Sequence, residues 1–269
     1  MSTTTEEIAD QQPSSDQPEP APVVKTQRRR PPIGLFGLPI AVAVVMVGWL
    51  IWRFSADLSS VDLRTLGWGP LGRLTWEHLK LTLVGTLIVT VIAIPLGIAL
   101  TRPGLRRASP FVVAFANGGQ AAPSIGLMVL LAMWLGFGFW TAILALSVYA
   151  ILPVLRNTIT GLDGVDRTLI EAGRGMGMSA VAVMLRIELP LAVPVIMSGV
   201  RTALVLMVGT ASLATFINAG GLGLLITTGV NLFRNEILIT GGILIAALAL
   251  LIDWVGRLLE FVVRPKGMR

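Results

Sequence analysis

Six long apolar stretches, separated by shorter polar segments, dominate the hydrophobic pattern of this chain. They cover about residues 34–52, 81–100, 111–135, 139–155, 191–210 and 237–259. A helix needs about 20 apolar residues to cross a bilayer, whereas the strands of a membrane barrel alternate apolar and polar positions over about 10 residues. Because the stretches are continuous, they predict an all-α integral membrane protein with about six transmembrane helices.

The polar segments divide the chain into five predicted regions. Residues 1–32 are rich in Thr, Gln, Ser, Pro and Glu, and this composition predicts a disordered tail. We expect an N-terminal membrane anchor at 33–55, an extracytoplasmic loop at 56–80, a transmembrane domain at 81–261 and a short tail at 262–269. Signal peptides also place basic residues ahead of an apolar run. This run is long enough to span a bilayer, which favours a retained anchor.

The distribution of basic residues predicts the orientation of the chain. Hydrophobic residues make up 54% of the sequence and charged residues 13%, and the mean hydropathy of +0.79 excludes an ordinary soluble domain. The pI of about 10.9 is therefore attributed to membrane topology and not to nucleic acid binding. With both termini in the cytoplasm, 15 of the 21 Lys and Arg residues lie inside and 5 outside. The positive-inside rule favours this orientation, in a multi-pass protein of the cytoplasmic membrane.

One charged interval, residues 163–190, falls on the cytoplasmic side in this orientation. Asp166 predicts the cap of a helix at about 167–174, which Gly173, Gly175 and Gly177 then break. Ser179 predicts the cap of a second helix that reaches the membrane edge. The interval carries seven residues at fixed spacing, namely Glu171, Ala172, Gly173, Gly177, Ile187, Leu189 and Pro190.

This spacing resembles the EAA loop, E-A-A-x3-G-x9-I-x-L-P, of permease subunits in binding-protein-dependent ABC importers. The resemblance implies that the seven residues dock on ABC ATPase subunits. It also implies a second permease subunit, the same or homologous, and an extracytoplasmic substrate-binding protein. Gly173 departs from the pattern, which has a second Ala there, and Gly lowers helix propensity by about 1 kcal/mol. A solvated connection between two spans is the alternative interpretation.

Two further segments, 153–162 and 216–223, resemble the corresponding segments of osmoprotectant permeases. Those proteins import glycine betaine, carnitine, choline or proline betaine. The resemblance covers about residues 76–261 and implies a fold of the methionine-importer type, with a five-span core and one additional N-terminal span. A permease for methionine or for an aliphatic sulfonate is the alternative within the same class.

Glycine and proline mark two candidate parts of a translocation path. Glycines at 220, 221 and 223 follow Asn218 and predict non-helical backbone at the outer side, as in a re-entrant gate that faces a binding protein. An ordinary outer loop is the alternative. Pro123 predicts a kink in the third span, and this kink either lines the path or is purely structural.

The motifs that are missing from the sequence exclude several chemistries. No G-x-x-x-x-G-K-[ST] occurs, so we expect ATP to be bound by a partner subunit, with no cofactor and no enzymatic activity in this chain. The chain has no Cys, and its one histidine, His78, is expected in a solvated loop. We therefore expect no metal site.

The charged residues inside spans bear on two alternatives from other classes, an ion-driven carrier or channel and a polytopic membrane enzyme. Arg201 and Asp253 are the candidates. Asp253 precedes Arg257 by four positions, which predicts an ion pair on one helix face, and Arg201 is expected to reach the interface or a carboxylate. Neither the paired intramembrane charges of ion-coupled transport nor a His, Cys, Asp and Glu cluster near a span is evident.

Overall fold

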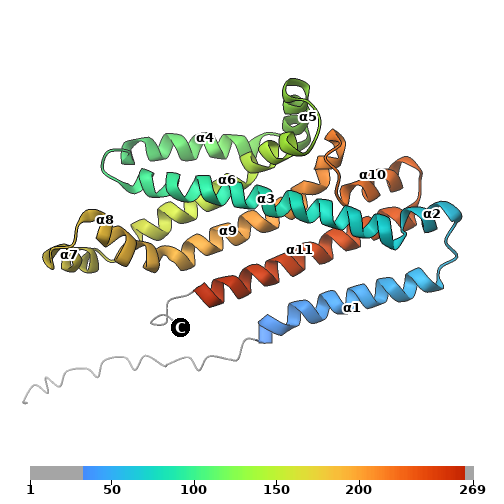
Figure 1. Ribbon diagram of the computed structural model, residues 1–269, viewed down its shortest axis with the longest axis horizontal. Helices are drawn as coiled ribbons and strands as arrows, with labels where there is room; N and C mark the ends of the chain where they lie inside the picture. The colour runs from blue at the N-terminus through green and yellow to red at the C-terminus, as the bar shows by residue number, and fades with distance from the viewer. Residues whose placement is uncertain (1–32, 264–269) are drawn as a thin grey trace, which may run out of the picture. The chain divides into compact units, whose positions relative to one another are not determined.

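The computed structural model describes residues 33–263, which are helical except for short connections (Figure 1). The α-helices in this range are α1 Ile33–Ser55, α2 Ser60–Thr65, α3 Trp68–Thr101, α4 Ser109–Ala121, α5 Ser124–Leu135, α6 Phe139–Asp163, α7 Arg167–Gly175, α8 Ala180–Val183, α9 Leu189–Ala211, α10 Gly223–Asn231 and α11 Asn235–Val263. Two 3₁₀-helices, Arg106–Ala108 and Ser212–Ile217, and a π-helix, Met184–Glu188, connect some of them. The all-α prediction is confirmed. The predicted tails lie outside the described residues, except that 262–263 end α11.

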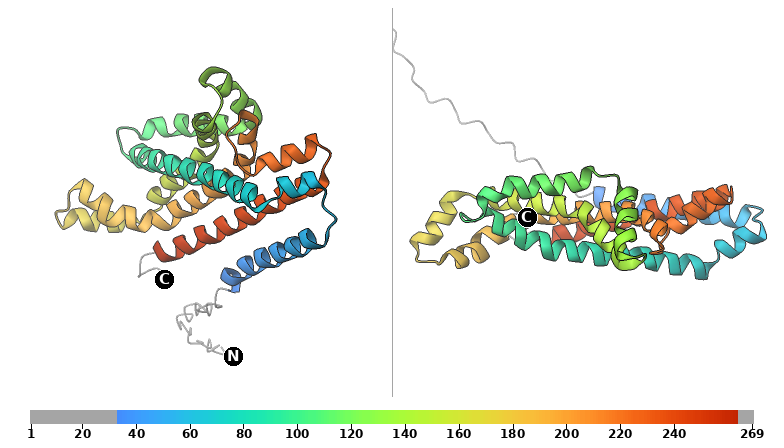
Figure 2. Two further views of the ribbon diagram at one scale, coloured as in Figure 1. Left: turned by 45° about the vertical axis from the view of Figure 1, so that its right-hand side comes forward. Right: turned by 90° about the horizontal axis from the view of Figure 1, so that it is seen from above.

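Helices α3, α6 and α9 form the centre of the fold, with α6 packed on both of the others (Figures 1 and 2). Small residues make the closest contacts. A Cβ on Gly199 of α9 would lie 2.7 Å from the carbonyl oxygen of Pro153, and one on Gly97 of α3 would lie 2.7 Å from the Cβ of Thr158. Lipid is as apolar as the side chains, so close backbone approach drives helix association in a membrane. These glycines therefore fix where the three helices cross.

The six predicted apolar stretches all coincide with helices. Among the described residues, five helices are long and apolar enough to cross a membrane: Gly37–Ser55, Trp68–Thr101, Phe139–Asp163, Ala180–Ile217 and Asn235–Glu260. The remaining stretch, 111–135, is divided between α4 and α5, whose axes are bent by 96°. The described chain therefore has five candidate spans, or six if the bent pair is counted as one.

The break between α4 and α5 is sharper than the kink that Pro123 predicts. Pro123 occupies the N-cap position of α5 with an extended backbone. The hydroxyl of Tyr149 on α6 donates to the carbonyl of Ala122, and the side chain of Gln120 donates to the carbonyl of Tyr149 over 2.7 Å. Since the bond from Tyr149 satisfies a carbonyl at the break, the helix can end and restart inside an apolar stretch.

The prediction of an extracytoplasmic loop at 56–80 is wrong in its second half, because that part of the chain is helical. Helix α2 occupies part of it, capped by Ser59 and Asp62, and α3 already begins at Trp68. His78 is correspondingly not in a solvated loop, because it lies in α3 and is fully buried. Charged residues lower the hydropathy of 68–80 and conceal the first turns of the helix. The ring of His78 finds hydrogen-bond partners in α9 and at Leu222, as described below.

Candidate coupling site

Helix α7 is the first part of the interval 163–190, and its bounds match the helix predicted at about 167–174. Asp166 caps it, because its carboxylate accepts from the backbone N–H of Thr168 over 2.9 Å. Hydrogen bonds from the backbone and then the side chain of Thr168 lower the pKa of the exposed Asp166 below its ordinary value of 3.8. The stabilisation is present above the unfolded pKa and is lost only as pH falls through the lowered one. The cap is therefore intact at neutral pH.

Gly173 does not break α7, contrary to the sequence prediction, but lies buried within it. A Cβ at this position would lie 2.6 Å from the Cδ1 atom of Ile187. Glycine therefore lets the isoleucine of the return segment pack directly on α7. This contact gives a physical reason for the Gly that stands where the resembled pattern has Ala.

The chain reverses at Gly177, which has a φ of +82°. The backbone N–H groups of Gly177 and Met178 donate to the carbonyls of Arg174 and Gly173, over 2.9 and 3.2 Å, and so close the end of α7. Left-handed backbone of this kind is strained for residues with a Cβ. The turn therefore requires glycine at 177.

The return segment is continuous with a membrane helix and does not end at Pro190. Ser179 caps α8 by accepting from the N–H of Ala182 over 3.2 Å, as predicted. The π-helix Met184–Glu188 then leads directly into α9, which has Pro190 in its first turn. Proline lacks an N–H and crowds the carbonyl four residues earlier, so a wider helical turn ahead of it avoids both conflicts. The segment from α8 to α9 is thus one continuous helical run.

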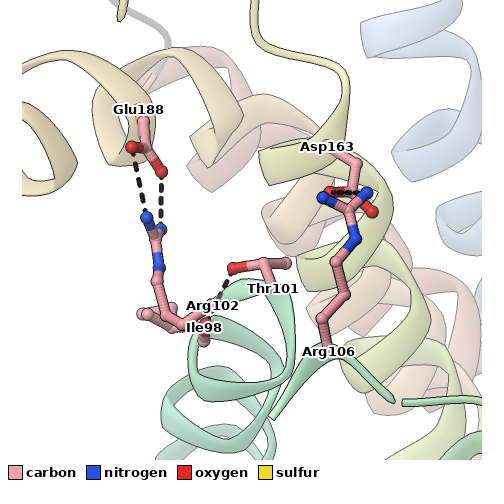
Figure 3. A network of polar contacts seen from close by, with 6 residues as sticks. All are labelled: Ile98, Thr101, Arg102, Arg106, Asp163 and Glu188. Atoms are coloured by element: carbon pink, nitrogen blue, oxygen red, sulfur yellow. Dashed lines mark hydrogen bonds and ion pairs between the residues drawn. The ribbon is translucent and has the colours of Figure 1, made fainter. Parts of the chain in front are cut away.

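Two ion pairs connect this interval to the end of α3 (Figure 3). Arg102 contacts both carboxylate oxygens of Glu188, with its Nη2 atom 2.5 Å from Oε2 and its Nη1 atom 3.2 Å from Oε1. The Nη2 atom of Arg106 lies 3.3 Å from Oδ1 of Asp163. A cavity of about 340 Å³ lies between these segments and is lined by Glu171, among other residues. The interval 163–190 is therefore fixed at both of its ends.

Breaking the Arg102–Glu188 pair is expected to have asymmetric effects on stability. The side chain of Glu188 is 7% exposed and that of Arg102 is 36% exposed. Arg102→Met leaves a buried carboxylate unpaired and should cost about 3 kcal/mol, whereas Glu188→Gln leaves a cation that water reaches and should cost about 1 kcal/mol. Thermal unfolding of the purified protein measures both losses.

The charge-swapped double variant Arg102→Glu with Glu188→Arg is the control for this pair. It should recover part of the loss seen in Arg102→Met, because opposite charges again face each other. Equal losses in the two single variants would contradict the predicted asymmetry. A charge-swapped double variant that is no more stable than Arg102→Met would contradict a direct interaction.

The second predicted site, around 218–223, lies at the other end of α3 and α9 (Figure 1). Asn218, Gly220 and Gly221 all have positive φ, so non-helical backbone is present here as predicted. Asn218 and Gly220 line a cavity of about 390 Å³ together with Glu77 and other residues of α3. Gly223 instead starts α10, and Pro123 lies at the break between α4 and α5. Of the predicted path residues, Asn218 and Gly220 therefore line this cavity, and Pro123, Gly221 and Gly223 do not.

Glu77 and His78 contact this loop and were missed as site residues by the sequence prediction. Glu77 accepts from the backbone N–H of Gly221, and His78 accepts from that of Leu222. A Glu-His pair directly ahead of an apolar stretch was the available signal. The low hydropathy of this pair indicated a loop instead. Its partners, Gly221 and Leu222, lie 144 residues away along the chain.

The intramembrane charges are paired with one another. Asp253 lies 3.0 Å from the Nε atom of Arg257, as the i,i+4 spacing predicts. It also lies 2.6 Å from the Nε atom of Arg201, whose Nη1 atom is 3.7 Å from Glu260. Arg201 therefore reaches carboxylates of α11. Among residues 33–263, no group of three or more His, Cys, Asp or Glu residues is placed to hold a metal ion.

Comparisons with known proteins agree on one family. Residues 93–265 match the model of the binding-protein-dependent transport system inner membrane component family. The glycine betaine/carnitine/choline transport system permease protein OpuCB of Bacillus subtilis is 41% identical over 207 residues, which cover 77% of this chain and 94% of that protein. The osmoprotectant import permease protein OsmW of Salmonella typhimurium is 39% identical over 206 residues, which cover 75% of this chain and 95% of that protein.

A solved structure gives the fold. An inward-facing form of the MetNI methionine ABC transporter contains a chain that aligns with a TM-score of 0.66 and 27% identity, over 77% of this chain and 100% of that chain. The prediction of a methionine-importer type of fold is confirmed.

Proposed function

Because this chain belongs to the binding-protein-dependent transport system inner membrane components, we propose that it is the permease subunit of an ABC importer for glycine betaine, carnitine or choline. The observation that carries this proposal is the 41% identity that extends over 94% of a permease for these solutes. Family membership implies ATPase and substrate-binding partners. We propose that two ATPase subunits, a second permease subunit and an extracytoplasmic binding protein complete the transporter.

The interval 163–190 supplies the mechanical connection that such a transporter needs. Helix α7 is tied to the return segment by the contact of Gly173 with Ile187, and the return segment continues into α9. Glu188 also joins it to Arg102 at the end of α3. When docked ATPase subunits move on binding ATP, α7 would carry α9 and the end of α3 with it. Transport then follows from the difference in ATPase binding between the inward-facing and outward-facing states.

The ion pairs also support the proposed orientation. The contact between Arg106 and Asp163 means that α3 and α6 end on the same side of the membrane. Since α6 crosses once, the chain must reach its start by crossing once through α4 and α5. We therefore propose that the bent pair is one span, which gives six spans and places both ends of the chain on one side of the membrane. The excess of basic residues supports the cytoplasm as that side.

Uptake measurements in cells test the proposed cargo. Deleting the gene should remove ATP-dependent uptake of labelled glycine betaine, choline or carnitine, and a plasmid copy should restore it. Excess unlabelled methionine should leave the uptake unchanged, while an excess of an unlabelled quaternary ammonium solute should suppress it. Loss of methionine uptake on deletion, with uptake of all three quaternary ammonium solutes unaffected, would contradict the proposed cargo.

A further inference from the structure

The one histidine of this chain is buried in α3 and joins two other segments through its ring. The Nδ1 atom of His78 lies 3.3 Å from the backbone N–H of Leu222, and its Nε2 atom lies 2.9 Å from the carbonyl oxygen of Val208 on α9. A backbone N–H can only donate and a carbonyl can only accept. The ring must therefore be the neutral tautomer with its proton on Nε2, and both nitrogens are used.

The neighbouring residue, Glu77, contacts the preceding amide of the same loop. Its Oε2 atom accepts from the N–H of Gly221 over 3.1 Å. Two successive side chains of α3 thus bind two successive backbone amides that follow Gly220. Because the bound groups are backbone amides, these contacts position the main chain of the loop directly.

Glycine is needed for this close approach. Gly220 and Gly221 have φ values of +83° and +93°. A Cβ at 220 would lie 2.4 Å from Oε2 of Glu77, and one at 221 would lie 3.1 Å from Nδ1 of His78. The Glu-His pair and the Gly-Gly pair therefore fit each other, although they are far apart in sequence.

We propose that Glu77 and His78 are positioning residues that hold the loop 218–222 in place as a wall of the cavity at this end of the molecule. The cavity, of about 390 Å³, lies between this loop and α3. Phe139, at the start of α6, also lines it. The ring of His78 also donates to the carbonyl of Val208 on α9, the helix that continues from the interval 163–190. A defined loop position is needed for solute to enter the path. That last step rests on the proposed function, while the positioning itself does not.

Two substitutions at His78 separate the bond to the loop from the bond to α9. The side-chain oxygen of Asn can replace Nδ1 as an acceptor, so His78→Asn keeps the bond to Leu222 and loses the bond to Val208. The amide nitrogen of Gln can replace Nε2 as a donor, so His78→Gln keeps the bond to Val208 and loses the bond to Leu222. Glu77→Gln retains a side-chain oxygen that can accept from the N–H of Gly221, and Glu77→Leu does not.

Spin labelling reads the loop position directly. The chain has no Cys, so a single introduced Cys carries the label without background. Leu224, which is 41% exposed and follows the loop in the first turn of α10, is a suitable position for Leu224→Cys. Val181 in α8, which is 62% exposed, provides the control variant Val181→Cys at the coupling end.

A mobile component of the spectrum at position 224 is expected in His78→Gln and Glu77→Leu. His78→Asn and Glu77→Gln should keep the parent spectrum, and the label at 181 should be unchanged in every variant. An unchanged spectrum in both His78→Gln and Glu77→Leu would overturn the proposal. Equal mobility in His78→Asn and His78→Gln would also overturn it, because the bond to Leu222, which only His78→Asn keeps, would then not be what holds the loop.

Transport provides a second readout. Uptake should fall about tenfold in His78→Gln, which loses the bond to the loop and leaves the N–H of Leu222 without an acceptor. It should stay within about twofold of the parent in His78→Asn, which keeps that bond. A mobile loop with normal uptake would overturn the link between loop position and transport. The spin-label result does not depend on the cargo, so an error in the proposed function would leave it valid. If His78→Gln does not fold, the Glu77 pair gives the same comparison.

Discussion

Glu171→Lys and Gly177→Asp are each expected to abolish uptake while the protein still inserts into the membrane. Glu171 lies in α7 and lines a cavity shared with several arginines, so a lysine there reverses the charge offered to a docked subunit. Gly177 has a φ of +82°, and a residue with a Cβ is strained by about 1–2 kcal/mol in left-handed backbone. The turn that presents α7 is therefore altered without any change to the spans.

Co-purification of the ATPase and uptake of labelled solute measure this effect together. A matched pair of alanine substitutions serves as the control. Gly177→Ala is strained, whereas Gly175→Ala places its Cβ in open space and should retain uptake. Normal ATPase co-purification and normal uptake in both Glu171→Lys and Gly177→Asp would contradict docking at this interval.

Gly223→Ala is expected to prevent folding of the domain. A Cβ at this position would lie 1.8 Å from the carbonyl oxygen of Ser212 and 2.7 Å from its carbonyl carbon. The opposing atoms belong to the backbone, so no side-chain rotation relieves the clash. Either α10 or the 3₁₀-helix Ser212–Ile217 must shift. We expect little protein at the monodisperse position in size-exclusion chromatography and no uptake.

Gly242→Ala is the matched control for this substitution. Gly242 lies in α11 with nothing within 4 Å of the added Cβ. The unfolding free energy of the Gly242→Ala variant should stay within about 0.5 kcal/mol of the parent value. A Gly223→Ala variant that folds and transports as well as Gly242→Ala would show that the close contact of Gly223 with Ser212 does not exist.

Continuous hydrophobicity was sufficient to predict the fold class and the six helical regions. Such stretches have few alternatives in a bilayer, because every backbone polar group must be satisfied internally. The starts of α7 and α8 were equally predictable, since their caps, Asp166 and Ser179, are local signals that act over two or three residues. Local signals of this kind do not require knowledge of the tertiary structure.

The features that were mispredicted depend on partners distant in sequence. Gly173 was expected to break a helix, and only the packing of Ile187 shows why glycine is needed there. His78 looked like a loop residue because its partners are a carbonyl on α9 and an amide beyond it. The full break at Pro123 depends on Tyr149, whose hydroxyl reaches the carbonyl of Ala122. Hydropathy carries no information about these contacts.

The energy source of uptake tests the central claim most directly. Proteoliposomes that contain the permease, its ATPase and a solute-loaded binding protein should accumulate labelled glycine betaine only when ATP is present on the ATPase side. Accumulation should persist when an ionophore removes all ion gradients. Uptake that continues without ATP and stops with the ionophore would contradict the account and identify an ion-driven carrier.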